Sequence, residues 1–332
     1  MDPLAQGLAG AALSASASRD SKETRLAIGV GFLAGLAPDL DVFIRSSADP
    51  LLRLEFHRQF THSLLFIPVG GFLVAGILWL ILRRKVSFRR LFVFAALGYG
   101  THGLIDACTS YGTYLLWPFS YVRIAWNNVA IIDPVFSVGV LLLLLVAFIR
   151  RNLRTARLAL AFGLAWLLVG VVQRERAESV VRELAEGRGH LVERVVVKPS
   201  IFNNVLWRST YLADGGIHAD AIRLRLFGEP LLFEGGSVPL LDFDELEASC
   251  GKDSRAFRDV KRFTHFSDGF VARKPGDPNV IGDFRYSLLP DGLDPVWGVR
   301  INPDKPDGPI SFENFRKLDD ATWDRFLSML FD

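Results

Sequence analysis

Residues 57–82 of the chain are HRQFTHSLLFIPVGGFLVAGILWLIL. The twenty residues from Ser63 to Leu82 carry no charge. At about 1.5 Å per residue, a helix of this length crosses the roughly 30 Å hydrocarbon core of a bilayer. Two histidines, His57 and His62, precede this apolar segment, and basic residues follow it at 83–85. The stretch therefore predicts a membrane-spanning helix that starts beside two imidazoles.

The composition of the chain predicts a membrane domain in its first half. Of 332 residues, 50% are hydrophobic, and the mean hydropathy is +0.26. The apolar residues are concentrated before about residue 173,. The net charge of +2 gives no indication of nucleic-acid binding,. The two cysteines, Cys108 and Cys250, form neither a zinc-finger spacing nor a disulfide framework, so any metal ligands would be histidine and carboxylate,.

Further apolar segments predict further spanning helices, at residues 26–44, 91–122, 124–149 and 158–173. The only charge in the second of these is Asp106, and the only charge in the third is Asp133. Both aspartates are thus expected at or near membrane depth, where a carboxylate is costly and normally marks a functional site. Asp133 also precedes Pro134, a combination typical of a helix N-cap, so we favour capping for Asp133.

The first eighteen residues are small and apolar. Ala15-Ser16-Ala17 resembles a signal-peptide cleavage site. However, Asp2 stands where a signal peptide carries positive charge, and no basic residue precedes Arg19,. We therefore expect a short retained helix.

Basic clusters at residues 19–25, 83–90 and 150–157 predict the orientation in the membrane. They alternate along the chain so that all three can lie on the cytoplasmic side, as the positive-inside rule requires. With this orientation the polar candidates fall at the opposite, outer ends of their segments, and the C-terminal part lies outside the cytoplasm. These candidates are Gln6, Asp39, Asp41, His57, His62, His102, Asp106 and Asp133.

After Gln173 the composition becomes that of a soluble domain. We expect strands at 191–198, 204–212, 217–227, 280–288 and 296–301, and helices at 242–249, 254–263 and 320–331. The predicted fold class is an α-helical polytopic membrane domain followed by a smaller soluble α+β domain. The membrane domain covers residues 1–173, a linker helix 174–190, and the extracytoplasmic α+β domain 191–332.

Two pairs of candidate ligands lie on predicted helices or at their ends. His102 and Asp106 are four residues apart, so on a helix they share one face and can bind one ion,. The alternative is a structural hydrogen bond between helices. Pro38 predicts that the preceding helix breaks into an extended turn, which presents Asp39 and Asp41 toward the same side. The alternative for these two aspartates is exposure to solvent at a helix end.

His57 and His62 are five residues apart, a poor helical match. They lie at a loop-to-helix junction, where a turn can bring both rings inward. Thr61 between them resembles an N-cap for a helix that starts at His62. The alternative is that both histidines face interfacial water.

The combination of histidines and aspartates from several segments predicts a site for one or two divalent metal ions, with zinc as the leading candidate. The expected ligands are Asp39, Asp41, His57, His62, His102 and Asp106. A bound metal lowers the pKa of its water from 15.7 to about 7 and polarises a phosphoryl or carbonyl oxygen. Asp41 is a candidate general base. Arg58 is a candidate for holding an anionic substrate, and its alternative is a salt bridge with a lipid headgroup or loop.

Several short motifs carry a resemblance to a known family: MDPLAQG at residues 1–7, APDLD at 37–41, HRQFTHS at 57–63, HGLID at 102–106, NNVLWR at 203–208 and DFRY at 283–286. In this order they resemble the YdjM-like family of bacterial inner-membrane proteins, over nearly the whole chain. The resemblance implies a metal-dependent hydrolase in the bacterial inner membrane, with the six histidines and aspartates above at its centre. Where family members carry Thr-His, this chain has Ala5-Gln6, so Gln6 is expected to donate a hydrogen bond instead of binding metal.

The sequence thus predicts a multi-pass membrane enzyme that hydrolyses a lipid or lipid-linked ester, most plausibly a phosphoester, at the outer face. Its expected partners are the bilayer and this substrate, without nucleic acid, and the oligomeric state is not predicted. One alternative is a transporter, which would need polar residues along residues 66–82 and 135–149, and these segments have almost none,. Another is an assembly or receptor protein whose function resides in the outer domain.

Overall fold

The computed structural model describes residues 1–46, 48–317 and 319–332 and divides the chain into two compact units. The first unit comprises Met1–Phe43, Phe56–Val172 and Ile201–Asn204. The second comprises Ile44–Glu55, Gln173–Ser200 and Val205–Asp332. Ser47, in the predicted loop before His57, and Leu318 lie outside the described residues.

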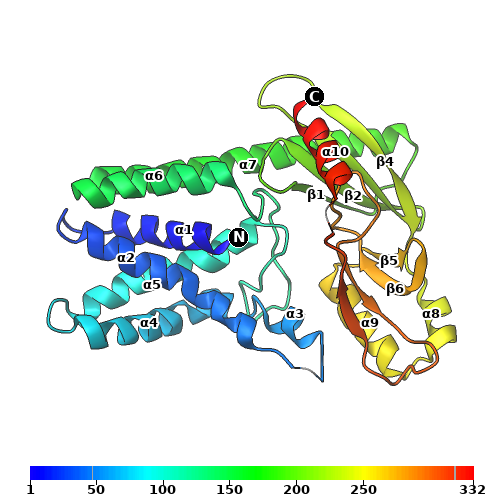
Figure 1. Ribbon diagram of the computed structural model, residues 1–332, viewed down its shortest axis with the longest axis horizontal. Helices are drawn as coiled ribbons and strands as arrows, with labels where there is room; N and C mark the ends of the chain where they lie inside the picture. Colours follow the sequence, from blue (N-terminus) through cyan, green and yellow to red (C-terminus); the bar gives the residue numbers. More distant parts are fainter. Residues whose placement is uncertain (47, 318) are drawn as a thin grey trace. The chain divides into compact units, whose positions relative to one another are not determined.

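The first unit is helical, as predicted. Its elements are α1 (Pro3–Ser16), α2 (Thr24–Leu36), the 3-10 helices η1 (Ala37–Phe43), η2 (Phe60–His62) and η3 (Leu64–Phe66), α4 (Ile67–Leu82), α5 (Phe88–Cys108), α6 (Pro134–Arg150) and the first part of α7 (Leu153–Gly187) (Figure 1). The predicted N-terminal helix is α1. Ten of its fourteen residues are buried, and it packs against α2, α5 and α6.

Within the described part of the chain, four helical segments are long and apolar enough to cross a membrane: Thr24–Phe43, Leu64–Leu82, Phe88–Cys108 and Leu153–Gly187. The fifth, α6, has 17 residues and is shorter. Many large apolar side chains of α4 and α6 are exposed, among them Phe72, Leu80 and Leu142. Apolar side chains in such positions are stable where lipid surrounds the helix. The first unit is therefore a multi-pass membrane domain.

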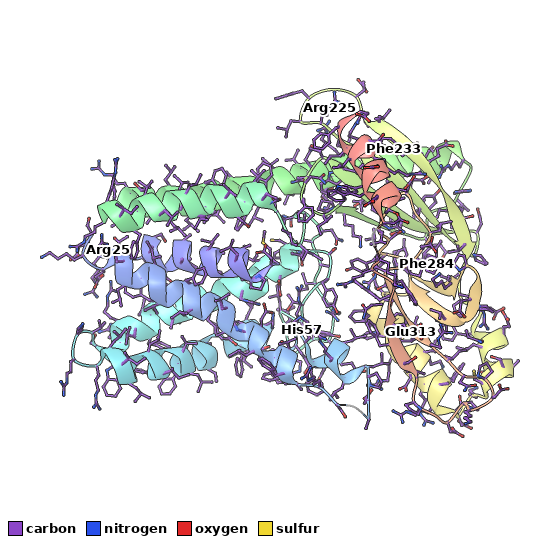
Figure 2. All side chains as sticks on the ribbon, in the orientation of Figure 1. Arg25, His57, Arg225, Phe233, Phe284 and Glu313 are labelled. Atoms are coloured by element: carbon purple, nitrogen blue, oxygen red, sulfur yellow. The ribbon has the colours of Figure 1, made fainter. Side chains whose placement is uncertain are left out.

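The basic connections and the candidate ligands lie at opposite ends of this helical unit. Arg25 stands at the start of α2, and Asp39 follows its end. In Figure 2 the labels of Arg25 and His57 mark the two ends of the helical unit. The connections after α1, α4 and α6 lie at the end marked by Arg25 (Figure 1).

Small residues let α1, α2 and α5 approach closely. A methyl group added at Gly31 of α2 would lie 2.4 Å from the carbonyl oxygen of Gly10 in α1. One added at Gly98 of α5 would lie 2.6 Å from the carbonyl oxygen of Gly31. Contacts between small residues of this kind are the usual means of packing helices in lipid, where the hydrophobic effect does not drive them together.

The second unit contains two four-stranded antiparallel sheets and additional helices. The first sheet has the order β1 (Arg194–Pro199), β2 (Leu206–Ala213), β3 (Gly216–Arg223), β4 (Leu231–Pro239). The second has the order β5 (Val271–Lys274), β6 (Asp277–Asp283), β7 (Trp297–Arg300), β8 (Ser311–Asn314). The helices are α3 (Leu52–Phe56), α8 (Phe243–Cys250), α9 (Arg255–Phe266), α10 (Asp320–Phe331) and the second part of α7. The last residue of α3, Phe56, is already counted with the first unit.

The core of the first sheet forms against α7. Ala177, Val181 and Ala185 recur at helical spacing and are fully buried with Trp207 and Ile222 of β2 and β3,. The predicted α+β class of the C-terminal domain is thus confirmed. The predicted linker helix 174–190 is not separate, because α7 continues unbroken from Leu153 to Gly187.

Three strands were not predicted: β4, β5 and β8. Eight of the nine residues of β4 are exposed or half-buried, and two adjacent glycines interrupt its pattern. β5 and β8 have only four residues each. Such short or edge strands lack the alternation of apolar and polar residues that identifies a half-buried strand.

The segment Ile44–Glu55 belongs to the second unit, although it precedes the ligands His57 and His62 in the sequence. Arg262 of α9 connects this segment to the second unit. Its guanidinium group lies 2.7 Å from Glu55 Oε1, 2.8 Å from Asp49 Oδ2 and 2.8 Å from Asp259 Oδ1. The predicted boundary at residue 173 placed residues 44–55 in the membrane domain. Their long-range ion pairs with Arg262 instead assign them to the second unit.

We predict that Gly31→Val destabilises the protein, whereas Gly29→Val in the same helix does not. The valine at position 31 would collide with the backbone of α1, while the space around Gly29 is open. Overpacking of this kind typically costs about 1–3 kcal/mol. The measurement is the fraction of detergent-purified protein that stays monodisperse after heating. Equal heat stability of the two variants would contradict the close packing of α1 and α2.

Candidate metal centre

Asp39 and Asp41 reach the centre from η1. Helix α2 ends at Leu36, and the chain continues through Pro38 as a 3-10 helix to Phe43. The predicted extended turn is therefore wrong. Proline is compatible with the first turn of a helix because the missing N–H has no helical acceptor there, so Pro38 starts η1 instead of breaking the helix into an extended chain. Asp39 and Asp41 are two residues apart on η1, so their carboxylates contact different neighbours.

His102 and Asp106 lie near the end of α5, on the same face, one turn apart,. Both side chains are fully buried. His102 Nε2 lies 3.7 Å from Asp106 Oδ2. The helical spacing thus places the two side chains beside each other, as a shared ligand role requires.

His57 follows α3, and His62 ends η2. Between them Arg58 has φ +66°, a left-handed backbone conformation that turns the chain,. The two rings lie 5.9 Å apart in an edge-to-face arrangement. The expected N-cap role of Thr61 is wrong, because Thr61 lies within η2 and Ser63 caps the next turn through the N–H of Phe66. The tight turns of η2 and η3 take the place of a helix starting at His62.

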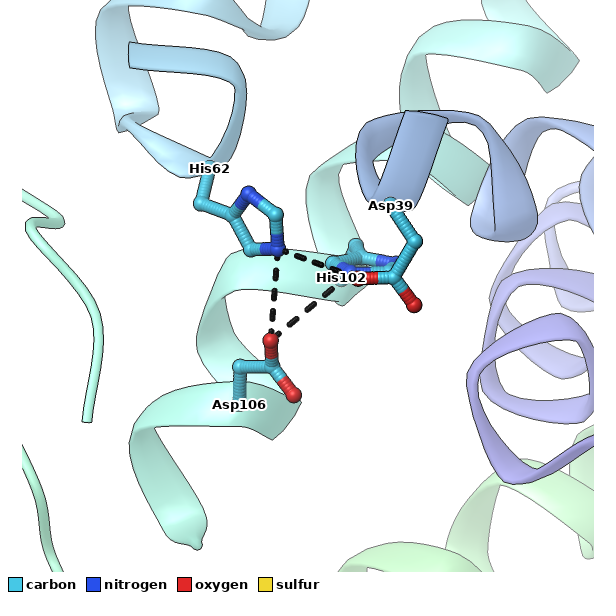
Figure 3. Close-up of side chains that lie close together, drawn as sticks. All are labelled: Asp39, His62, His102 and Asp106. Atoms are coloured by element: carbon cyan, nitrogen blue, oxygen red, sulfur yellow. Dashed lines mark hydrogen bonds and ion pairs between the residues drawn. The ribbon is translucent and has the colours of Figure 1, made fainter. Parts of the chain in front are cut away.

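Four ligand atoms converge at one point. They come from Asp39, His62, His102 and Asp106, and all lie within 4.8 Å of one another (Figure 3). His62 Nε2 is 3.3 Å from Asp106 Oδ2 and 3.5 Å from Asp39 Oδ1. His102 Nε2 is 3.3 Å from Asp39 Oδ1. We call these four residues the central cluster.

The hydrogen bond of His102 to the backbone assigns its tautomer. His102 Nδ1 lies 2.5 Å from the carbonyl oxygen of Gly35, at the end of α2. A carbonyl oxygen can only accept, so Nδ1 carries the proton. The other nitrogen, Nε2, then faces Asp39 Oδ1 at 3.3 Å and Asp106 Oδ2 at 3.7 Å. Backbone and carboxylate partners fix metal-binding histidines in the same way.

Thr61 and Asp41 place the proton of His62 on Nδ1, as Gly35 does for His102. The Thr61 hydroxyl donates to Asp41 Oδ2 at 2.6 Å, so it can only accept from His62 Nδ1, 2.9 Å away. His62 Nδ1 is also 3.2 Å from Asp41 Oδ2. Both neighbours require a proton on Nδ1, so His62 Nε2 is the nitrogen that is directed into the central cluster.

The central cluster therefore brings the Nε2 atoms of two histidines and the oxygens of two carboxylates together. His62 Nε2 and Asp106 Oδ2 are buried, and among the described residues neither has a hydrogen-bond partner. Arg58 Nε lies 3.0 Å from Asp106 Oδ2, an ion-pair distance, but without hydrogen-bond geometry. Buried acceptors that face one another need a shared cation. Two imidazoles and two carboxylates are a donor set that suits Zn²⁺.

The pKa of His62 reflects the negative charge around it. Burial lowers this pKa, but the neighbouring carboxylates, Asp106 foremost, outweigh burial and raise it to about 10. Without a metal, the carboxylates thus retain a proton on the imidazole. A divalent cation would replace that proton, because metal ligation requires the neutral ring.

The remaining two predicted ligands form a separate pair beside the central cluster. His57 Nδ1 lies 2.7 Å from Asp41 Oδ1. Together with Asp39, these residues form a second group whose ligand atoms lie within 4.8 Å of one another. All six predicted ligands are therefore brought together, four in the central cluster and two next to it.

The two remaining candidates from the sequence, Gln6 and Asp133, have different roles. Gln6 Nε2 donates to Asp106 Oδ1 at 2.7 Å, and the Met1 ammonium group contacts the same oxygen. The expected donor role of Gln6 is thus confirmed. Asp133 caps α6 by accepting the N–H of Phe136 at 2.9 Å, as predicted.

Sequence patterns did not identify three groups that position or border the ligands. The Gly35 carbonyl and the Thr61 hydroxyl orient the histidines. Tyr111 lies below two arginines, with the guanidinium carbons of Arg58 and Arg123 at 4.8 Å and 5.1 Å from its ring centroid. A backbone carbonyl leaves no sequence signal, and contacts of Tyr111 with residues far along the chain depend on tertiary structure.

Comparison with known proteins identifies one matching family model. The model for the YdjM inner membrane protein matches residues 1–177, which include all six candidate ligands. The uncharacterized protein YfhP of Bacillus subtilis (strain 168) is 22% identical over 233 residues, 69% of this chain and 68% of that protein. No solved structure matches the chain.

We predict that Thr61→Val weakens zinc binding about 10- to 100-fold, the usual effect of removing a group that orients a metal ligand. The substitution preserves shape but removes the acceptor for His62 Nδ1. Thr101→Val is the matched control, because the Thr101 hydroxyl donates to Gly98 of its own helix. Competition with a chromogenic chelator measures the affinities. Equal affinity of both variants would show that Thr61 does not orient the ligand.

Proposed function

The chain belongs to the YdjM inner membrane protein family, and we propose that it is a membrane-embedded, metal-dependent hydrolase acting on a lipid or lipid-linked phosphoester. The observation that carries the proposal is the convergence of His62, His102, Asp39 and Asp106, with the Nδ1 atom of each histidine hydrogen-bonded outside this cluster. These hydrogen bonds direct both Nε2 atoms at the two carboxylates, which is the orientation that shared ligation of one ion requires.

The proposed ligands are the four residues of the central cluster, with zinc as the leading candidate. When bound, such an ion supplies a Lewis acid that polarises a phosphoryl oxygen and lowers the pKa of a coordinated water. In the overall reaction the oxygen of water forms a bond to phosphorus and the P–O bond to the alcohol breaks. One proton of water goes to the departing alcohol, and the second is released or retained by the phosphate.

Asp41 has a positioning role in this proposal. Its Oδ2 accepts hydrogen bonds from the Thr61 hydroxyl and, at 3.0 Å, from the backbone N–H of Arg58. Its Oδ1 lies against His57. A carboxylate that accepts several hydrogen bonds is a weak base. These contacts favour orientation of His57 and His62 over the general-base role considered from the sequence.

Two arginines support an anionic substrate. Arg58 directs Nε toward Asp106 and lies over Tyr111, while Arg123 lies over both Tyr111 and Tyr114. Tyr111 and Arg123 are half-buried, and the Tyr111 ring is 6.2 Å from that of His57. A guanidinium group beside the metal centre binds the oxygens of a phosphate and stabilises charge in the transition state.

The position of the centre supports a lipid substrate. Asp39 lies in the last part of one candidate spanning segment, and His62 lies shortly before the start of another. His102 and Asp106 lie within the last turns of a third. A reacting group held there would lie close to the headgroups of the surrounding lipid. Following the positive-inside rule, we propose the outer leaflet and an extracytoplasmic C-terminal domain.

The purified protein is reconstituted in phosphatidylethanolamine vesicles that also contain either phosphatidate or phosphatidylglycerol. We predict that it hydrolyses one of these two lipids when supplied with Zn²⁺. Release of inorganic phosphate or glycerol phosphate is measured, and the activity is lost with a chelator and restored by metal. Asp106→Asn is expected to reduce release to the level of protein-free vesicles.

His265→Ala is the control, since His265 is an exposed histidine of α9 outside the centre. Metal bound at full occupancy without hydrolysis of either lipid would contradict this substrate assignment. Hydrolysis that is insensitive to both the chelator and Asp106→Asn would exclude the metal centre as its source.

A further inference from the structure

A second set of ligand-type side chains lies next to the central cluster. Asp39, Asp41 and His57 offer ligand atoms within 4.8 Å of one another. Asp39 belongs to both sets. Its Oδ1 faces His62 and His102.

The two sets differ in how open they are. The side chains of His62, His102 and Asp106 are fully buried, whereas those of Asp39 and His57 are 29% and 19% exposed. A set of three with exposure leaves coordination positions for water or substrate.

Asp41 is held in the orientation that the second set requires. The Thr61 hydroxyl and the backbone N–H of Arg58 both donate to Oδ2. The other oxygen, Oδ1, is thereby directed at His57 Nδ1, 2.7 Å away. Ligands of an unloaded metal site commonly pair with each other in this way, and the ion replaces the shared proton.

The charges around this set favour a cation. Asp39 and Asp41 contribute two carboxylates. The nearest guanidinium group, that of Arg58, is directed at Asp106 and Thr109. We propose that Asp39, Asp41 and His57 bind a second divalent cation, with Asp39 bridging the two ions through its two oxygens.

This inference rests on the proposed function and refines it. In two-ion centres, ions about 3.5–4 Å apart contact both the attacking and the departing oxygen of an in-line displacement. Such centres are typical of enzymes that cleave phosphoesters. The second ion would therefore be the one that meets the substrate, and the phosphoester becomes the substrate class that the centre suits best.

Metal stoichiometry of the detergent-purified full chain tests the inference. After reconstitution with Zn²⁺, elemental analysis is expected to find two ions per chain in the wild type and in His265→Ala, and one in His57→Ala. Asp39→Asn is expected to weaken binding of both ions. One ion in the wild type that is retained in His57→Ala would overturn the second site and leave the proposed function intact. Metal-free wild-type protein would overturn both.

A second measurement does not depend on the folding of a variant. Wild-type protein loaded with Mn²⁺ is expected to give the electron paramagnetic resonance spectrum of two exchange-coupled ions, because one carboxylate bridges them. A six-line spectrum of isolated Mn²⁺ at saturating metal would overturn the bridged centre.

Discussion

Two buried imidazole nitrogens that face two carboxylate oxygens are the constraint on which the candidate site depends. Gly35 holds the proton of His102 on Nδ1, and Thr61 with Asp41 does the same for His62. The opposite nitrogens then face Asp39 and Asp106. Such an arrangement requires a proton or a cation between nitrogen and carboxylate, and the proposed metal site rests on this feature.

Close packing of the helices makes this convergence feasible. Gly10, Gly31 and Gly98 let α1, α2 and α5 approach until backbone meets backbone. The ends of α2 and α5 then lie close enough for the Gly35 carbonyl to reach His102. Larger residues would separate the helices and lengthen this hydrogen bond. The small residues along the helices and the ligands at their ends are therefore parts of one arrangement.

Much of the fold could be predicted because hydropathy is a local property. The apolar segments identified the helices of the first unit, and alternation identified β2, β3 and β7 in the second. The edge strands β4 and β8 could not be predicted, because exposed or short strands carry little pattern,. Nor could the place of residues 44–55, since the ion pairs of Arg262 with Asp49 and Glu55 join positions about 200 apart.

The sequence by itself determined the type of protein and the candidate ligands, because membrane spans and polar residues at their ends are visible in the order of residues. It also determined that His102 and Asp106 share a helical face. Only the tertiary structure decided which ligands act together, that Asp41 pairs with His57, and that Thr61 orients His62 instead of capping a helix. The physical reason is that a hydrogen bond depends on distance and direction in space, and the partners here come from different elements whose approach the local sequence does not encode.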